Sequence, residues 1–380
     1  MPPRTRRPTV LGMATTTEHI ETVIVGGGQA GLAVGHHLAK RQKSFLILDA
    51  NERIGDNWRK RTWDSLRLFT PARYDGLPGW RFPAPAWSYP TRDELADYLE
   101  AYAARFELPI RARTTVEGLR KEAKTYVLSA GESRIEADNV IVASGFYRTP
   151  TVPGFAAELD PAIVQMHSSE YRNTSQLREG AILLVGAGNS GADIALEVAR
   201  EHQTLLSGPD KGQVPIRVES FSARFVLPIL WFVASRILTV RTPLGRKVRP
   251  HVLASGAPRI RVKSKDLTAA GVELVPRTIG VQDGLPLLED GRVLEVANVI
   301  WCTGFLPDFG WIDLPVFAED GRPVQQRGVV ASAPGLYFLG LDFLYSFTSE
   351  NVGGVGTDAE HIAEHIAAQR RNGRGAAPTP

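Results

Sequence analysis

Two glycine-rich hexapeptides have the residue types and spacing of turns that hold a dinucleotide. The first, Gly26-Gly27-Gly28-Gln29-Ala30-Gly31, follows the β-branched run 21–25 and precedes the helix-forming segment 32–40. In this pattern the first glycine permits a tight turn, the second lets the backbone approach a pyrophosphate, and the third lets helix and strand pack closely. The free N–H groups and the positive helix end then face the phosphates. We expect Gly26, Gly28, Gln29, Ala30 and Gly31 to bind that pyrophosphate.

An acidic residue follows this unit where a ribose would lie. The apolar run 45–48 is typical of a second strand and ends in Asp49. A carboxylate roughly 20 residues beyond the glycines is placed to accept hydrogen bonds from ribose hydroxyls. The order of strand, glycine turn, helix, strand and acid is therefore the order expected of a dinucleotide-binding unit.

The same arrangement recurs in the middle of the chain. The apolar run 181–185 leads into Gly186-Ala187-Gly188-Asn189-Ser190-Gly191, and a helix-forming segment, 192–201, follows. One such unit is typical of a dehydrogenase, whereas two predict a flavin and the nicotinamide that reduces it. We assign FAD to the first unit and a nicotinamide dinucleotide to the second, with Gly186, Gly188, Asn189, Ser190 and Gly191 as its contacts.

The strand that closes the second unit, around 203–206, differs from its counterpart at the end. It continues as Ser207-Gly208-Pro209-Asp210-Lys211, so no carboxylate stands directly at the strand end. A 2′-phosphate would not be repelled there. Ser207, Lys211 and Arg217 are candidate contacts, which favours NADPH and leaves NADH open.

These motifs require an α/β fold with two Rossmann-like dinucleotide-binding domains. A strand at 138–143 ends in Ser144-Gly145 and a strand at 296–301 is followed by Thr303-Gly304, which we interpret as two crossovers between domains. The last strand of the FAD domain, 335–340, follows the second crossover, so the NAD(P)H domain is inserted into the FAD domain. A helix at 93–105, a hairpin within 113–128 and a terminal helix at 358–370 complete the prediction. The expected divisions are a disordered arm at 1–17, the FAD domain at 18–150 and 305–372, the NAD(P)H domain at 151–304, and a tail at 373–380.

Composition limits the other possibilities. Hydrophobic residues make up 43% of the 380 residues and charged residues 22%, which is ordinary for a soluble globular protein. The single cysteine, Cys302, leaves no partner for an intramolecular disulfide or for Cys-x-x-Cys chemistry, and a cytoplasmic location fits. The net charge of +3 gives no reason to expect nucleic acid.

A basic stretch stands out against this modest net charge. No Asp or Glu occurs between Ser220 and Lys265, where ten Lys and Arg residues do. It is open to three interpretations: a solvated face, a field for a phosphorylated cofactor, or contact with an anionic membrane surface. The apolar run 225–240 within it is too short to span a bilayer, and suits a buried helix, a cover for a substrate channel or an interfacial element. Membrane contact through 225–240 is possible but not expected.

With these residues in hand, the sequence resembles the flavin-containing monooxygenases, especially the small bacterial members and the plant auxin-forming branch. The resemblance runs from about 21 to 370 and includes both glycine hexapeptides. It also includes Gly55-Asp56-Asn57-Trp58, Asp64-Ser65-Leu66-Arg67-Leu68 leading to Thr70-Pro71, Ala143-Ser144-Gly145, Arg224-Phe225-Val226-Leu227-Pro228, and Cys302-Thr303-Gly304-Phe305.

The resemblance implies that NAD(P)H reduces FAD and that O2 adds to the reduced flavin as a C4a-(hydro)peroxyflavin. One oxygen atom then passes to a small soft nucleophile, a sulfide, amine or ketone, without a protein nucleophile or metal. It places Thr70 and Asn351 beside the flavin as the only candidates for a catalytic role. It further implies FAD contacts at Asn57, Trp58, Leu66, Thr70, Val116, Ser144, Gly145, Asp342 and Asn351, and nicotinamide contacts at Cys302, Thr303 and Gly304.

Two departures from the family pattern bear on oxygenation. Pro161 and Ile163 stand where the family fingerprint before His167 has Phe and Gly, and no asparagine corresponds to the family's flavin-side asparagine near Thr70. Two other functions therefore stay open: an NAD(P)H-dependent flavin reductase or oxidase that produces peroxide, and a flavin-bound partner or sensor with little turnover. A dimer is plausible.

Overall fold

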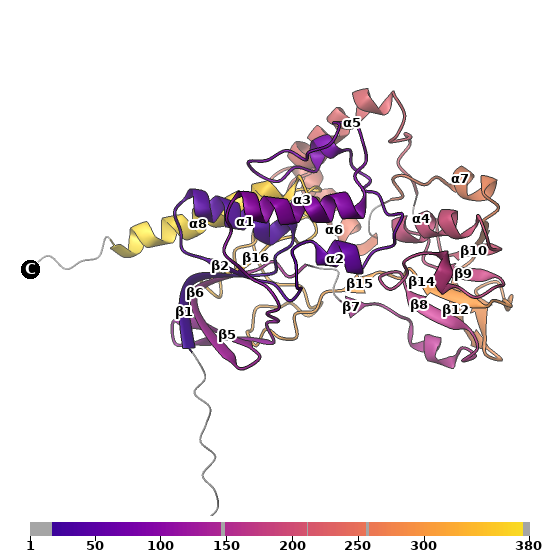
Figure 1. Cartoon of the computed structure of the whole chain (residues 1–380), viewed down its shortest axis with the longest axis horizontal. Coiled ribbons are helices and arrows are strands. Elements are labelled where there is room, and N and C mark those ends of the chain that lie inside the picture. Colours follow the sequence, from indigo (N-terminus) through magenta and orange to yellow (C-terminus); the bar gives the residue numbers. More distant parts are fainter. Residues whose placement is uncertain (1–16, 146–148, 211, 256–257, 375–380) are drawn as a thin grey trace, which may run out of the picture.

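The computed structural model describes residues 17–145, 149–210, 212–255 and 258–374, and of residues 254–255 and 370–374 it describes the backbone only. Its described part has two lobes, each built on a largely parallel sheet (Figure 1). Residues 1–16 and 375–380, which hold most of the predicted arm and tail, lie outside the described residues, as do Lys211, 146–148 and 256–257.

The first sheet forms around the strand that leads into the first glycine turn. Its order is β3-β2-β1-β6-β5-β4, with β16 paired to β6. Val23, Ile24 and Val25 are almost completely buried, as expected for a β-branched strand covered on both faces. The strands are β1 (Thr17–Val25), β2 (Leu46–Leu48), β3 (Ile110–Arg111), β4 (Gly118–Glu122), β5 (Thr125–Ala130), β6 (Ser133–Val142) and β16 (Leu336–Phe338).

β1 begins four residues earlier than the sequence predicts. Thr17, Glu18 and His19 are exposed, yet they continue the parallel ladder with β6 from Thr17 opposite Arg134 onward. The predicted arm at 1–17 is therefore too long by one residue at least. Exposed strand ends lack the apolar signal of a core strand, which is why the pattern missed them.

Helices pack on the first sheet, in which β1, β2, β3, β6 and β16 pair in parallel and β4, β5 and β6 pair antiparallel. α1 (Gln29–Lys40) connects β1 to β2 and packs beside α8 (Val355–Arg374) (Figure 1). α2 (Asp56–Lys60) and α3 (Arg92–Arg105) follow. Thr91 caps α3 through a reciprocal pair with Glu94, which satisfies two backbone N–H groups at the helix start.

The second sheet has the order β11-β10-β9-β14-β8 and is parallel throughout. All four residues of its central strand β9 are buried. The strands are β8 (Val164–His167), β9 (Ile182–Val185), β10 (Thr204–Ser207), β11 (Glu273–Val275) and β14 (Asn298–Trp301). The helices α4 (Asn189–Val198) and α7 (Ser264–Ala269) and the hairpin β12 (Thr278–Gln282) and β13 (Leu285–Leu288) complete this lobe.

The chain passes between the lobes along two adjacent segments. β7 (Thr149–Pro150) leads out of the first lobe and pairs antiparallel with β15 (Phe305–Leu306), which leads back. β6 and β16 are parallel neighbours in the first sheet although the whole second sheet lies between them in sequence. The second domain is thus inserted into the first, while the division points at 150 and 304 stay a prediction.

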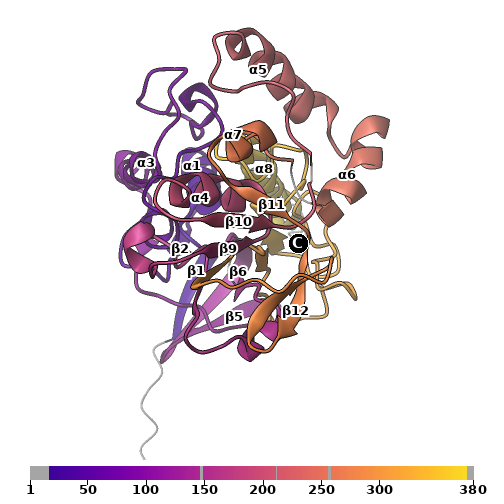
Figure 2. The same cartoon turned by 90° about the vertical axis from the view of Figure 1, so that its right-hand side faces the viewer.

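The apolar run 225–240 forms an exposed helical arm. α5 (Ala223–Phe232) continues into a π-helical turn (Val233–Ile237) and is followed by α6 (Pro243–Ser255). In Figure 2 both helices stand at the outer edge of the molecule. Phe225 and Ile229 are 67% and 64% exposed, so the buried-helix interpretation is wrong. No helix in the described parts of the chain is long and apolar enough to cross a membrane.

Three single helical turns lie in the connections between these elements. They are η1 (Ala72–Tyr74), η2 (Gly154–Glu158) and η3 (Thr174–Gln176).

Candidate functional site

The first glycine turn is shaped by close contacts at two of its glycines. Gly26 has φ +110°, and a Cβ there would lie 2.4 Å from the carbonyl oxygen of Ala143. A Cβ on Gly31 would lie 1.9 Å from the carbonyl oxygen of Gly26. A Cβ on Gly28 would meet nothing within 4 Å, so the turn leaves open space beside this residue alone. The helix start has neither a side-chain cap nor an acid in its first turn, which leaves its N–H groups available to an anion.

Asp49 closes the back of this turn. Its Oδ2 accepts a hydrogen bond of 2.6 Å from the backbone N–H of Gly27, and its Oδ1 accepts two from Asn51. The carbonyl oxygen of Asp49 also accepts a hydrogen bond from the N–H of Thr114, which lies two residues before the buried Val116. An ionised carboxylate has further lone pairs, so Asp49 retains capacity for a ribose hydroxyl.

Two buried polar atoms beside the same turn have no partner within the protein. Ser144 follows β6 and Asp342 follows β16, and the Ser144 Oγ and Asp342 Oδ1 atoms are buried without a hydrogen bond. Gly145 beside Ser144 has φ +81° and open space at its Cβ position. Buried polar atoms normally have partners. These two, both predicted FAD contacts, fit a dinucleotide that supplies hydroxyl and phosphate groups.

The predicted flavin-side residues Thr70 and Asn351 belong to segments that meet. Gly353, at the start of α8, is so close to the loop carrying Thr70 that a Cβ would lie 1.9 Å from the carbonyl oxygen of Tyr74. Asn351 supports the helix start, because its carbonyl oxygen accepts bonds from Gly354 and Val355. A cleft of about 890 Å³ adjoins this contact, lined by residues that include Tyr74, Trp80, Phe82, Trp231 and Gly353.

Thr70 donates a hydrogen bond of 2.5 Å to Oδ1 of Asp75. Asp75 is 1% exposed, and its Oδ2 has no hydrogen-bond partner. Burial raises the pKa of Asp75 to about 7, although the bond from Thr70 opposes that rise. Asp75 was not among the predicted site residues, because a single acid in a loop carries no pattern.

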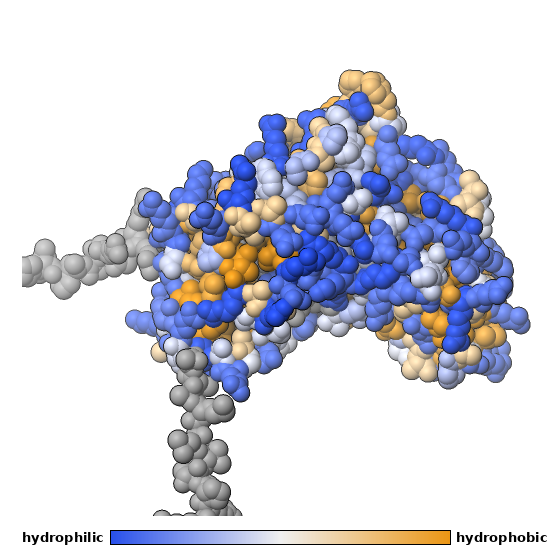
Figure 3. Space-filling model, in the orientation of Figure 1, coloured by the Kyte–Doolittle hydropathy of each residue, from blue (hydrophilic) through white to orange (hydrophobic). Residues whose placement is uncertain are grey.

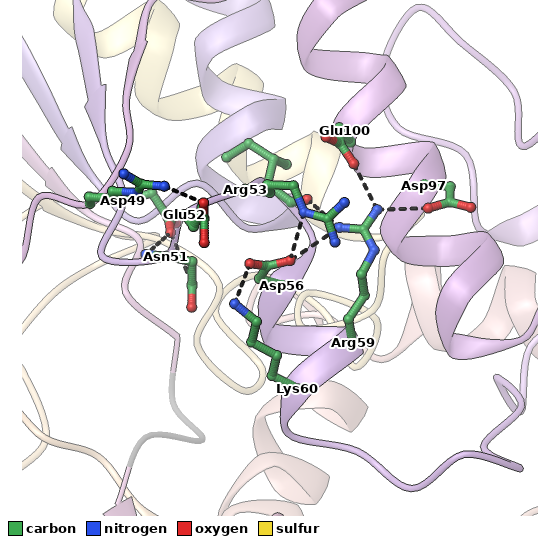
Figure 4. A network of polar contacts seen from close by, with 11 residues as sticks. Asp49, Asn51, Glu52, Arg53, Asp56, Arg59, Lys60, Asp97 and Glu100 are labelled. Carbon is green, nitrogen blue, oxygen red and sulfur yellow. Dashed lines mark hydrogen bonds and ion pairs between the residues drawn. The ribbon is translucent and has the colours of Figure 1, made fainter.

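α2 and α3 are locked together next to the first site (Figure 4). The buried Asp56 contacts Lys60 at 2.7 Å and both Arg53 and Arg59 at 3.4 Å. Burial opposes its ionisation, but Lys60 and Arg53 hold the pKa of Asp56 below its usual value. The predicted contacts near Asp56 differ in burial: Asn57 is exposed, whereas Trp58 and Leu66 pack against the first core.

The second glycine turn repeats the geometry of the first. Gly186 has φ +114°, and its Cβ would lie 2.2 Å from the carbonyl oxygen of Cys302. A Cβ on Gly191 would lie 2.0 Å from Gly186, and one on Gly188 would meet nothing within 4 Å. α4 also begins without a side-chain cap or an acid. In both domains, therefore, the crossover strand abuts the first glycine and the second glycine faces open space.

The predicted contacts at the end of β10 differ from one another in burial and in their partners. The Ser207 hydroxyl is fully buried and pairs with the carbonyl oxygen of Pro276 and with Thr278. Arg217 is exposed and forms an ion pair with Asp266. Lys211 lies outside the described residues. Asn189 and Ser190 open α4, where Asn189 bonds to the backbone of Pro258 and Ile260.

That contact brings Arg259 to the second site, a residue that the sequence analysis placed only in the basic stretch. Its guanidinium is 2% exposed and lies 2.9 Å from Asp210, just beyond β10. It also donates to the Ser264 hydroxyl at 2.6 Å. Seventy residues separate Arg259 from Asn189, so no local spacing could have joined them.

Cys302, Thr303 and Gly304 lie at the crossover between the lobes. The Thr303 hydroxyl bonds to the carbonyl oxygen of Thr151, and the carbonyl oxygen of Gly304 lies 3.1 Å from Nε2 of His167. Burial raises the pKa of the Cys302 thiol to about 12, so it stays protonated near neutral pH. Thr303 and Gly304 therefore also have contacts within the protein, and nicotinamide binding by these three residues stays a prediction.

Comparisons with known proteins agree with this geometry. The family profile described as pyridine nucleotide-disulphide oxidoreductase matches residues 23–212. An uncharacterized CzcO-like oxidoreductase of Geobacillus kaustophilus is 39% identical over 91% of this chain and 98% of its own. A probable indole-3-pyruvate monooxygenase of Arabidopsis thaliana, YUCCA3, is 28% identical over 91% of this chain and 86% of its own.

Among solved structures, a flavin-containing monooxygenase from Stenotrophomonas maltophilia superposes with a TM-score of 0.74. It is 25% identical and covers 93% of this chain and 99% of its own. The chain is therefore an oxidoreductase with the two-domain fold of the flavin monooxygenases, and it belongs to the pyridine nucleotide-disulphide oxidoreductase family.

Proposed function

We propose that this protein is an FAD-dependent monooxygenase that consumes NADPH and O2 and oxygenates a small soft nucleophile, a sulfide, amine or ketone. The observation that carries the proposal is the pair of matched glycine turns, each with open space at its second glycine. The flavin, when bound, supplies the activation of O2. The likeness to the Stenotrophomonas maltophilia enzyme and to YUCCA3 favours oxygenation over other flavin reactions.

The residues of the first domain would hold FAD by three kinds of contact. Backbone N–H groups at the start of α1 would bind the pyrophosphate, and Asp49 would accept from a ribose. Ser144 and Asp342 would use their unpartnered atoms on the remaining hydroxyl and phosphate groups. The loop carrying Thr70 and the Asn351 segment would enclose the flavin ring and keep water away from it.

The second domain would bind NADPH at the start of α4. Arg259 is a buried cation paired with Asp210, just beyond the strand end that selects between a 2′-hydroxyl and a 2′-phosphate. Its present partner Asp210 is 62% exposed and can turn to solvent. This arrangement supports NADPH as the preferred donor.

The decisive measurement is the fate of the electrons from NADPH. The purified, FAD-loaded protein is mixed with NADPH and a panel containing an aryl sulfide, a tertiary amine and a cyclic ketone, and NADPH loss, peroxide and oxygenated product are all quantified. Monooxygenation requires one product molecule for each NADPH consumed in a coupled reaction. Peroxide equal to NADPH with every substrate would exclude the proposal, and no NADPH oxidation would indicate a sensor.

An NADPH oxidase that releases peroxide is a second candidate, and Asp75 favours it. This buried carboxyl has a pKa of about 7 and an unpartnered oxygen, and it is bonded to Thr70, near which the resemblance to the flavin-containing monooxygenases implies an asparagine that this chain lacks. A proton source beside reduced flavin and O2 would promote peroxide release. If so, Asp75→Asn should lower the ratio of peroxide formed to NADPH consumed.

A further inference from the structure

The arm formed by α5 and α6 presents a continuous apolar stripe to solvent. Phe221, Phe225, Ile229 and Phe232 are 69%, 67%, 64% and 57% exposed. Their spacing of four, four and three residues places them on one face of the helical segment. Single exposed apolar side chains are normal, but a row of four large ones marks an interaction surface. We call these four residues the α5 stripe.

The opposite face of α5 is fastened to the body of the protein. Trp231 stacks on Tyr74 with ring centroids 4.6 Å apart. The backbone beyond α5 is held as well, because Val240 N–H donates to Tyr345 and Phe347 N–H donates to Leu238. The stripe is thus held outward by contacts behind it. Figure 3 shows apolar side chains at the projecting tip where Figure 1 places α5.

The surface around the stripe is strongly cationic. The segment 220–265 has ten Lys and Arg residues and no acid. Five of them are exposed along the arm, from α5 through the π-helical turn to the first half of α6: Arg224, Arg236, Arg241, Arg246 and Lys247. A helix with Phe and Ile on one face and cations beside it is typical of a segment that lies in the interface of an anionic membrane.

We propose that the α5–α6 arm docks on the surface of an anionic lipid bilayer, with the α5 stripe among the lipid headgroups and the cations on their phosphates. A second copy of the chain fits this surface less well, because a symmetric contact would bring two acid-free cationic segments together. The arm would lie on the bilayer, since no helix in the described residues is long and apolar enough to span one. Because Trp231 also lines the 890 Å³ cleft, docking would hold that cleft beside the bilayer.

The test is flotation of the full-length, FAD-loaded protein with vesicles of phosphatidylcholine alone or mixed with phosphatidylglycerol. We expect binding to the anionic vesicles that weakens as salt is raised. Phe225→Ser with Ile229→Ser should weaken binding at least about tenfold by removing buried apolar area. Arg246→Glu with Lys247→Glu should do the same, because each surface cation contributes about a fivefold factor.

Two matched pairs serve as controls. Leu274→Ser with Ile279→Ser removes exposed apolar side chains from the second lobe, and Lys40→Glu with Arg200→Glu reverses exposed charges on α1 and after α4. Both should bind like the wild type. Absence of binding to anionic vesicles, or equal losses in stripe and control variants, would overturn the proposal. A wild-type dimer that the stripe variant converts to monomer, without vesicle binding, would assign the stripe to self-association instead.

Discussion

At the scale of single residues, the glycines of each turn have separable roles. A side chain at Gly26 or Gly31 would collide with backbone of the protein itself, so these two positions are fixed by folding. Gly28 has φ −75°, which any residue tolerates, and no atom lies within 4 Å of its Cβ position. The need for glycine at Gly28 can therefore come only from a ligand.

Gly28→Ala should weaken FAD binding without unfolding the protein. The added methyl group meets no protein atom but occupies the space proposed for the pyrophosphate. We expect the free energy of unfolding of the apoprotein to change by no more than about 0.5 kcal/mol, and the Kd for FAD to rise at least about tenfold. Flavin titration and denaturant unfolding measure the two effects. The control Gly31→Ala should unfold the apoprotein more easily, and unchanged FAD affinity in Gly28→Ala would contradict the assignment.

Asp75 should make the apoprotein less stable as pH rises. In the unfolded chain its carboxyl ionises near the ordinary value of 3.8, whereas burial raises the folded-state pKa to about 7. Between these values the folded state binds more protons than the unfolded state, so stability falls with rising pH and levels off above 7. Asp75→Asn should recover roughly 2–4 kcal/mol at pH 8 and little at pH 4.

Thermal unfolding of the wild type and of Asp75→Asn across pH 4–8 checks this sign. Burial also raises the pKa of Asp358 to about 7, so Asp358 adds a further loss of stability as pH rises. A residual slope should therefore persist in Asp75→Asn and shrink further when Asp358→Asn is added, while Asp193, whose pKa burial raises to about 6, still contributes. Equal slopes in wild type and Asp75→Asn would show that Asp75 ionises freely in the folded state.

At the scale of elements, the sequence predicted the helices and strands that a pattern of neighbouring residues marks. The β-branched strands before both glycine turns and the capped helix α3 were predicted within a few residues. α5 was left open, because an apolar run looks the same whether it is buried or exposed. Arg259 and Asp75 were missed as site residues, because their significance depends on contacts made by distant segments or on burial in a loop.

The junction of α2 with α3 depends on Arg59. Its guanidinium contacts Asp97 at 2.7 Å and Glu100 at 2.8 Å on α3, while it also reaches Asp56 on its own helix. The side chain is 14% exposed, so its loss leaves Asp56 with fewer compensating charges. We expect Arg59→Ala to lower the free energy of unfolding by about 1–3 kcal/mol. Arg59→Lys should retain more of the free energy of unfolding than Arg59→Ala but less than the wild type, because lysine lacks the planar guanidinium.

Denaturant unfolding of Arg59→Ala should be compared with that of Arg113→Ala. Arg113 also pairs with an acid, Glu52, but its side chain is 72% exposed. Exposed pairs contribute little, so its loss should cost no more than about 0.5 kcal/mol. A similar cost for both variants would mean that the Arg59 contacts do not join the two helices.

At the scale of the whole molecule, the two matched turns rest on different hydrophobic clusters. The first turn rests on the cluster around β1, and the second rests on two clusters that share β9. The paired segments β7 and β15 connect them, and the crossover residues Ala143 and Cys302 abut Gly26 and Gly186. Damage confined to one turn should therefore spare the other. This separation gives the two-cofactor proposal its sharpest test.

Gly188→Ala should impair NADPH use while leaving the flavin in place. Gly188 has φ −79°, and its Cβ position is as open as that of Gly28, so the substitution is compatible with folding. The variant should keep wild-type flavin content and absorbance. Its KM for NADPH should rise at least about tenfold, because the methyl group occupies the space proposed for the second pyrophosphate.

Reduction by dithionite, which needs no nucleotide site, separates a lost donor site from a damaged flavin site. Gly188→Ala should reoxidise in O2 at the wild-type rate after such reduction, whereas its reduction by NADPH should be slow. Gly28→Ala should fail both steps unless it is saturated with FAD. A Gly188→Ala protein that loses flavin but reduces normally once FAD is restored would exchange the two assignments, because the second turn would then hold the flavin.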